Sequence, residues 1–280
     1  MPTNLAIQQD IFAANRATGH IALSVAVSGG RTRRKLVHED GSLRVRFPNA
    51  APEALEAVIV NTGGGMTGGD RFSIDIALEA GSMLIAGTAA AEKVYRSNGP
   101  DAEMAVTLEV AEGASLTWLP QETILFDQAR LTRRIDVDLA RGGSLLMAEA
   151  VVLGRAAHGE AMNRGYLADH WRMRHGGKLI YADTARLDGT IADKLGHAAV
   201  LAGGIAFATV LCAPANDAML GEKLEQVRAL GDTFQSEVGI SAWNGIAVAR
   251  FCAKDGATLR HDLIAVLAAL GTSVPRLWLQ

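Results

Sequence analysis

The sequence predicts a mainly β protein: stacked β-hairpins that form a sandwich or a β-helix-like solenoid, with two C-terminal α-helices. Three observations support this prediction: apolar and polar residues alternate strictly, a strand–glycine turn–strand pattern recurs, and the last third has helical spacing. The chain is 49% hydrophobic and 20% charged, which is typical of a globular protein with a substantial core. Because no low-complexity linker interrupts it, we expect a single continuous domain over residues 1–280, β-rich in 1–215 and helix-containing in 216–280.

The clearest strand lies at residues 72–78. Phe72, Ile74 and Ile76 alternate with polar or small residues, so their side chains share one face. The pattern of strand, glycine turn and second strand recurs between residues 70 and 190. Aligning Ser82, Ser115, Ser144 and Lys178 gives steps of 33, 29 and 34 residues. Units of this length that cannot bury their own apolar faces usually stack on one another.

The C-terminal third predicts two helices and a hairpin. The first helix runs from about Asp217 to Leu230, and the second from about Leu259 to Leu270 with Thr258 as its N-cap. Between them, residues 239–251 indicate a hairpin whose turn is Asn244-Gly245, because this dipeptide favours a tight two-residue turn.

Charge and composition exclude several classes of function. The net charge is -3, so nothing draws the whole chain to nucleic acid or to an anionic membrane. We interpret the basic run Arg31, Arg33, Arg34 and Lys35 as a solvated loop. Residues 198–215 are uncharged, but their Ala, Gly and Pro content indicates two buried strands around a glycine turn instead of a membrane span.

The N-terminus shows no basic region followed by an apolar stretch, so we expect no secretory signal and a cytoplasmic protein. Cys212 and Cys252 lie in apolar settings outside any metal-binding spacing. Buried, reduced thiols are the expected state of both.

A glycine run at residues 61–70, Asn-Thr-Gly-Gly-Gly-Met-Thr-Gly-Gly-Asp, is the most conspicuous motif. It formally satisfies GxGxxG, but a dinucleotide site needs a helix at that point, whereas a strand pattern follows. A dinucleotide-binding oxidoreductase is therefore only a weak alternative. Either a functional surface loop or a tight crossing between strands would explain the glycines.

Motifs for catalysis are missing from the sequence. It contains no GxxxxGK[ST] phosphate loop, no GxSxG elbow and no HExxH helix. We therefore expect a protein that is not an enzyme. A β-solenoid carbohydrate-active enzyme stays open as an alternative, with Glu149 and Glu160 as its paired acids. Aromatic residues, at 5% of the chain, are few for a groove that stacks sugars.

Several sequence blocks occur in an order that resembles the urease accessory protein family UreD, also called UreH. They are the glycine run, Ala91–Ser97, Trp118–Phe126, Glu149 with Leu153–Glu160, and Pro275–Trp278. The resemblance implies a β-rich scaffold with two C-terminal helices that binds UreF, the GTPase UreG through UreF, and apo-urease. Such a scaffold assists nickel insertion into the urease active site, without partners among nucleic acids or membranes.

The same resemblance implies no tightly bound cofactor, only transient passage of Ni²⁺. A metal path needs acidic or imidazole groups that bind weakly enough to release the ion. The candidates within the blocks are Asp70, Glu92, Glu122, Glu149, His158 and Glu160. Glu122 is the strongest of them, because apolar residues surround its charge. Arg96 and Arg155 could pair with these carboxylates, and a purely structural role for each group is the alternative.

Overall fold

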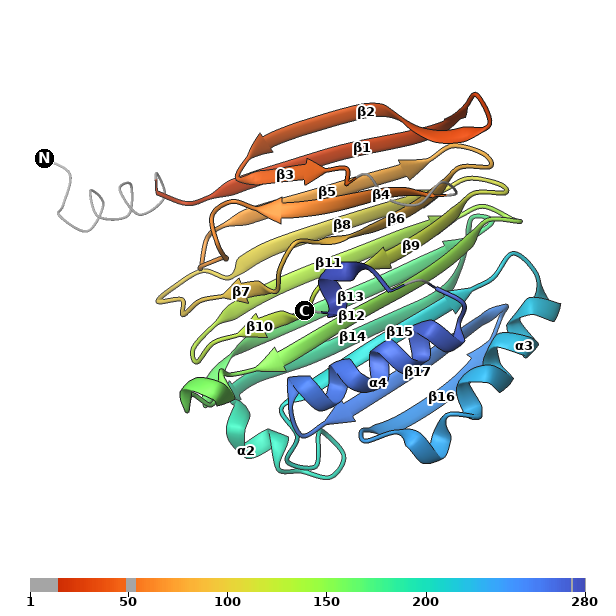
Figure 1. Cartoon of the computed structure of the whole chain (residues 1–280). Coiled ribbons are helices and arrows are strands. Elements are labelled where there is room, and N and C mark those ends of the chain that lie inside the picture. The colour runs from red at the N-terminus through yellow and green to blue at the C-terminus, as the bar shows by residue number, and fades with distance from the viewer. Residues whose placement is uncertain (1–14, 49–53, 273, 280) are drawn as a thin grey trace, which may run out of the picture.

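The computed structural model describes residues 15–48, 54–272 and 274–279, which form two β-sheets lying face to face (Figure 1). Within these residues the seven-stranded sheet contains, in spatial order, β14 (Lys178–Thr190), β13 (Arg164–His175), β11 (Arg130–Leu139), β8 (Ala102–Val110), β5 (Arg71–Leu78), β1 (Thr18–Ser28) and β2 (Arg31–Gly41). The prediction about a secretory signal concerns residues 1–14, which lie outside this description.

The second sheet has ten strands among the described residues. Its main path is β16 (Glu237–Trp243), β17 (Ile246–Ala253), β15 (Ala206–Ala213), β12 (Ser144–Leu153), β9 (Ser115–Leu119), β6 (Met83–Thr88), β4 (Leu55–Asn61) and β3 (Leu43–Arg46). Beside this path, β10 (Thr123–Leu125) pairs with β12 and with β7 (Glu92–Val94). The helical elements are α2 (Ile191–Leu195), α3 (Asp217–Arg228), α4 (Gly256–Ala269), η1 (Ala156–His158), η2 (Gly231–Thr233) and η3 (Arg276–Leu279).

The repeated units stack as the sequence predicts. Neighbouring strands β5, β8, β11 and β13 are parallel, and their register places Ile74, Val106, Ile135 and Trp171 side by side. In the first three units the second strand enters the other sheet, where β6, β9 and β12 are again parallel. Each of these units therefore gives one strand to each sheet, which confirms the solenoid-like stacking.

The sequence alignment of the units is wrong by one residue in the first unit. Ser115 pairs with Met83, whereas Ser82 lies in the turn and its hydroxyl donates to the Glu79 carbonyl at 2.6 Å. Residues 79–82 and 111–114 are turns of equal length between paired strands. The number of residues between the two strands sets the register of the second strand, and the type of residue in the turn does not.

The fourth unit has a different path. Gly176 and Gly177, with φ of 55° and 81°, connect β13 to β14, which pair as an antiparallel hairpin in the same sheet. A two-residue turn with positive φ at both positions closes a hairpin, whereas the four-residue turns carry the chain across to the other sheet. The stack of parallel strands consequently ends at β13.

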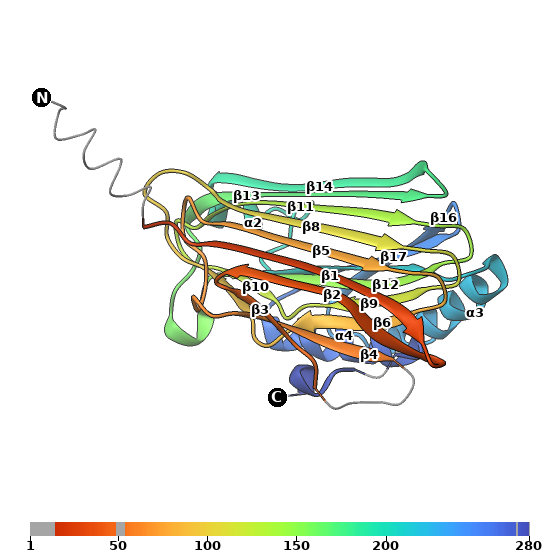
Figure 2. The same ribbon diagram turned by 90° about the horizontal axis from the view of Figure 1, so that it is seen from above.

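Apolar side chains fill the space between the sheets, and a second buried cluster lies on the outer face of the ten-stranded sheet. In that cluster Leu259, Leu263 and Val266 of α4 join Val210 and Phe251 of the sheet. Figure 2 shows α3 and α4 on this side, whereas α2 lies next to β13 and β14 of the seven-stranded sheet. Trp118 and Trp171 are both buried among the strands.

The predicted C-terminal elements are present, with one correction. Helices α3 and α4 occupy the expected segments, and Asn244 and Gly245 form the turn between β16 and β17 with positive φ at both residues. The N-cap of α4 is Asp255, not Thr258: the Asp255 carboxylate accepts a hydrogen bond from the Thr258 amide at 2.7 Å. The carboxylate satisfies a free amide of the first turn, so the helix begins earlier than predicted.

Two other interpretations are corrected. The basic run of Arg31 to Lys35 lies in the edge strand β2 instead of a loop, although its side chains are exposed as expected. Residues 198–215 contain one strand, β15, because the chain before it turns repeatedly around Gly203 and Gly204.

No helix in the described part of the chain is long and apolar enough to cross a membrane. Cys212 is buried and Cys252 half-buried, both as free thiols.

Candidate functional site

A buried group of charged side chains connects the two sheets. Arg133 on β11 donates from Nε and Nη2 to the Asp169 carboxylate on β13, at 2.9 and 2.6 Å. Its Nη1 donates to Glu149 Oε2 on β12 of the opposite sheet, at 2.5 Å. The three residues are each at most 5% exposed, so these charges lie deep inside the sandwich. We call Arg133, Glu149 and Asp169 the interior triad.

Strand alternation explains why these polar groups point inward. Arg133 is in phase with the buried Leu131 and Ile135, and Asp169 is its direct register partner on the next strand. The sequence analysis missed both residues, although a charge at an apolar position of an alternating strand was the available signal. Burial of an unpaired charge is costly, so each of these groups requires the others.

The surroundings of the triad shift the pKa values of Glu149 and Arg133. Burial raises the pKa of Glu149, while the Arg133 guanidinium and the Trp118 indole N–H favour the ionised carboxylate. The Trp118 indole donates to Glu149 Oε1 at 2.7 Å, so both oxygens of this carboxylate accept hydrogen bonds. For Arg133, burial acts to lower the pKa, but Asp169 and Glu149 outweigh it and raise the value. We infer that the triad holds one cation between two carboxylates.

A row of polar side chains extends from the triad toward both ends of the stack. Arg133 Nη1 also donates to Thr123 Oγ1 on β10, at 3.3 Å. Thr123 is the register partner of Glu92 on β7, so their side chains share the inner face. Glu92 Oε1 in turn accepts a hydrogen bond from the Asn61 side chain on β4, at 3.0 Å.

On the other side of the triad lies a cavity of about 20 Å³, which has room for about one water molecule. Asp183 of β14 and Thr209 of β15 line it together with the triad. The Asp183 carboxylate accepts from Arg250 at 2.8 Å and from the Tyr181 hydroxyl at 3.1 Å. We call Asn61, Glu92, Thr123, the interior triad and Asp183 the interior polar row.

Glu92 is a member of this row whose pKa lies near neutral pH. Burial raises the pKa of Glu92 from 4.5 to about 7, and the hydrogen bond from Asn61 only partly opposes the effect. Between pH 4.5 and about pH 7, Glu92 is therefore protonated in the folded state and ionised in the unfolded chain. The contribution of this group to stability is present at low pH and is lost as the pH rises through this window.

Glu92→Gln is accordingly expected to flatten the dependence of folding stability on pH. Wild type should lose about 2–3 kcal/mol of unfolding free energy through Glu92 between pH 5 and pH 8, and the variant should lose none of this component. Urea denaturation at both pH values measures the difference. Glu109→Gln, at an exposed position, is the matched control. A variant with the wild-type pH dependence would contradict the assignment to Glu92.

The glycine run closes tightly around neighbouring backbone. A Cβ atom at Gly65 would lie 2.7 Å from the Lys93 carbonyl oxygen, and one at Gly68 would lie 2.3 Å from the Pro100 carbonyl oxygen. Buried Asp70 accepts hydrogen bonds from the amides of Ala17 and Thr67, at 2.8 and 2.7 Å. These contacts support the interpretation as a crossing between strands. The strand β5 begins at Arg71, which removes the dinucleotide-binding alternative.

Gly68→Ala is expected to lower the unfolding free energy by about 1–3 kcal/mol, because backbone must move to admit the methyl group. Gly99→Ala is the control: a Cβ at Gly99 would meet no atom within 4 Å, so its effect should stay within about 0.5 kcal/mol. Thermal unfolding of both variants gives the comparison. Equal stability of the two variants would show that the crossing tolerates a side chain.

Glu122 belongs to a different group, on the helix side of the ten-stranded sheet. Arg260 of α4 donates to the Glu122 carboxylate at 2.5 Å and to the Gln121 side chain at 2.7 Å. It also donates to the Trp278 carbonyl at 2.9 Å, while the Trp278 indole donates to the Leu119 carbonyl at 3.1 Å. We call these five residues the C-terminal clasp. Glu122, our strongest sequence candidate, thus faces away from the interior polar row.

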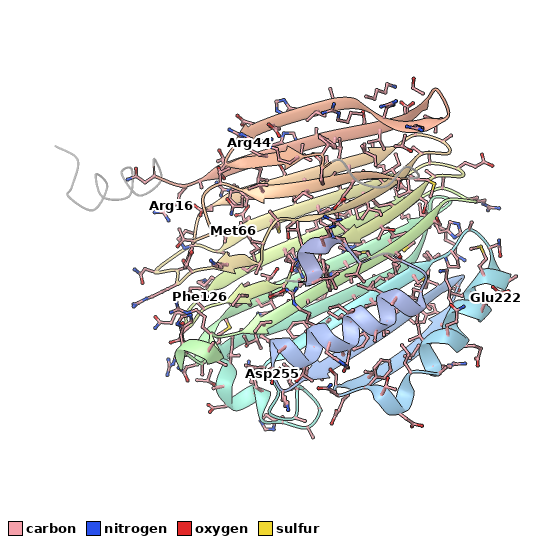
Figure 3. The ribbon with its side chains drawn as sticks, viewed as in Figure 1. Arg16, Arg44, Met66, Phe126, Glu222 and Asp255 are labelled. Carbon is pink, nitrogen blue, oxygen red and sulfur yellow. The ribbon has the colours of Figure 1, made fainter. Side chains whose placement is uncertain are left out.

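The last two candidates lie near the end of β12. Glu160 pairs with Arg155 and accepts a hydrogen bond from the Asp127 amide at 3.1 Å, while His158 is exposed in η1. The Arg155 guanidinium lies 4.1 Å from the centroid of the Phe126 ring. In Figure 3, Arg16, Met66 and Phe126 lie along one side of the stack.

Two pairings that the sequence left open do not form. Arg96 donates to Asn98 instead of a carboxylate, at 3.1 Å. Glu149 is enclosed by the interior triad, whereas Glu160 belongs to the loop after β12, so the two acids do not form the pair that a glycosidase needs. Among the residues that the structure describes, no three His, Cys, Asp or Glu side chains are placed to hold a metal ion together.

Comparison with known proteins adds evidence that the geometry alone does not supply. The model of the UreD urease accessory protein family matches residues 17–279. The chain belongs to the UreD family. A Urease accessory protein UreD of Rhodopseudomonas palustris is 56% identical over 269 residues, which cover 96% of this chain and 95% of that protein. One of Bradyrhizobium diazoefficiens is 51% identical over 279 residues, with 100% of each chain covered.

The sequence blocks behind the UreD resemblance contribute residues to the groups described above. Trp118–Phe126 and Glu149 contribute to the interior polar row, and Pro275–Trp278 contributes to the C-terminal clasp. In this member of the UreD family the row joins both sheets, and the clasp fixes the C-terminal segment to the ten-stranded sheet.

Proposed function

We propose that this chain is a non-enzymatic scaffold for urease maturation in the cytoplasm. It binds UreF, UreG through UreF, and apo-urease, and it assists insertion of Ni²⁺ into the urease active site. The observation that carries the proposal is the match of the UreD family model over residues 17–279. The tight packing of the glycine run and the pairing of Glu149 with Arg133 support a scaffold over the alternative enzymes.

In this proposal the interior polar row is the protected route of the ion. Glu92, Glu149, Asp169 and Asp183 supply oxygen ligands one after another across the stack. Oxygen donors that contact Ni²⁺ singly hold it weakly, which suits a cargo that has to be released. Asp70 and Glu122 serve the fold through their hydrogen bonds, and His158 and Glu160 lie after β12, outside the row.

Reconstitution of urease activation tests the scaffold role. Apo-urease, UreF, UreG, GTP and Ni²⁺ are combined with or without this chain, and urease activity is measured. We expect activation to depend on the chain, and the chain to co-purify with UreF and apo-urease. Full activation without it would refute the proposed function.

A second arm tests the route itself. Glu92→Gln removes a carboxylate from the interior polar row, and we expect slower activation with unchanged co-purification. Glu109→Gln removes an exposed carboxylate from the outer part of β8 and serves as the control. If Glu92→Gln activates urease at the wild-type rate, the row is not the route, although the scaffold role would stand.

A further inference from the structure

Arg133 occupies the middle of the interior polar row and closes it. The guanidinium contacts both oxygens of Asp169, one oxygen of Glu149 and the Thr123 hydroxyl. Its side chain is 3% exposed, and the adjoining cavity admits about one water molecule. A hydrated divalent cation needs far more room than this, so the row is continuous as a set of polar groups but is blocked at Arg133.

Charge leads to the same conclusion as size. Two carboxylates that face each other inside a protein attract a divalent cation strongly, and an ion bound there would leave slowly. The guanidinium already neutralises part of that charge, through a bidentate contact with Asp169 that its planar shape favours. A second cation near Arg133 would be repelled at short range in a medium of low polarity.

We propose that Arg133 is a resident counter-cation of the interior polar row: it occupies the place of a metal ion between Glu149 and Asp169 and keeps that place from trapping Ni²⁺. This inference rests on the proposed route. Passage of Ni²⁺ beyond this point requires the Arg133 side chain to leave the two carboxylates, and its return displaces the ion. Arg133 thus sets the affinity of the route for metal.

Binding of Ni²⁺ to the purified full-length chain tests the proposal without urease. Arg133→Met keeps an unbranched apolar stem and removes the charged guanidinium. Isothermal titration with NiCl₂ should show at least about tenfold tighter binding to this variant than to wild type. Arg133→Lys keeps the positive charge and should bind as weakly as wild type. Equal Ni²⁺ binding by wild type and a folded Arg133→Met variant would overturn the proposal.

Further variants separate the carboxylates from the rest of the molecule. Arg133→Met combined with Glu149→Gln and Asp169→Asn removes all three charges, and the gain in Ni²⁺ affinity should disappear. If Arg133→Met does not fold, the double variant Arg133→Met with Glu149→Gln replaces it. This double variant keeps the carboxylate of Asp169, which can be protonated. It should bind Ni²⁺ more tightly than the triple variant. Equal binding by these two variants would also overturn the proposal.

Measuring Ni²⁺ binding also separates the inference about Arg133 from the proposed scaffold role. If the chain proves dispensable for urease activation, the proposed function fails, but tighter Ni²⁺ binding by Arg133→Met would still establish the resident counter-cation. If activation requires the chain and Arg133→Met binds Ni²⁺ no better than wild type, the scaffold role stands and the inference about Arg133 fails.

Discussion

Arg133→Met is expected to lower the unfolding free energy by about 3–5 kcal/mol at pH 7, because it leaves Glu149 and Asp169 buried without their cation. Without Arg133, burial is opposed only by the hydrogen bond from the Trp118 indole, so the pKa of Glu149 rises further. An acid whose pKa is higher in the folded state contributes less stability as the pH rises. The loss should therefore be larger at pH 8 than at pH 5, as measured by urea denaturation.

The variant with Arg133→Met, Glu149→Gln and Asp169→Asn is the matched control. It removes the unpaired charges while keeping similar side-chain volumes, so it should recover part of the lost stability and have a smaller pH dependence. A single Arg133→Met variant that is as stable as wild type at pH 8 would mean that water or a movement of the strands solvates the two carboxylates.

Trp278→Ala should lower the unfolding free energy by about 3–5 kcal/mol, because the side chain is 4% exposed and its indole N–H donates to the Leu119 carbonyl. Removal of the Trp278 ring would also remove its contact with the Arg260 guanidinium, which lies 5.7 Å from the ring centroid. Thermal or denaturant unfolding measures the change.

Leu279→Ala provides the control for Trp278→Ala. This neighbouring side chain is 64% exposed, so its removal should change the unfolding free energy by no more than about 0.5 kcal/mol. Similar losses for the two variants would mean that the C-terminal clasp contributes nothing specific to stability.

Local sequence patterns predicted most of the fold, because the type of each strand, turn and helix depends mainly on residues close to it in the sequence. The alternation that starts at Phe72 defines a strand, and Asn244-Gly245 defines a hairpin, without reference to distant residues. The stacking also followed from sequence, since the units recur at similar intervals. The one-residue error at Ser82 arose because residue type was aligned, whereas the equal turn lengths set the register.

The candidate site was only partly predictable. Arg133 and Asp169 could have been found, because each interrupts the apolar phase of an alternating strand. The partner of Glu122 could not, because Arg260 is 138 residues away and only the packing of α4 on the sheet brings it close. The apolar neighbours of Glu122 correctly indicated a paired charge, but they could not show on which side of the sheet it lies.

The hairpins at both borders of the seven-stranded sheet limit how far the parallel stack can grow. Its inner strands would accept another parallel strand on an open border, as fibres do, but β2 and β14 each turn back in the antiparallel direction. The exposed Arg31, Arg33 and Arg34 on β2 add charge repulsion between like borders. Like charges therefore disfavour edge-to-edge pairing of two copies of the molecule through β2.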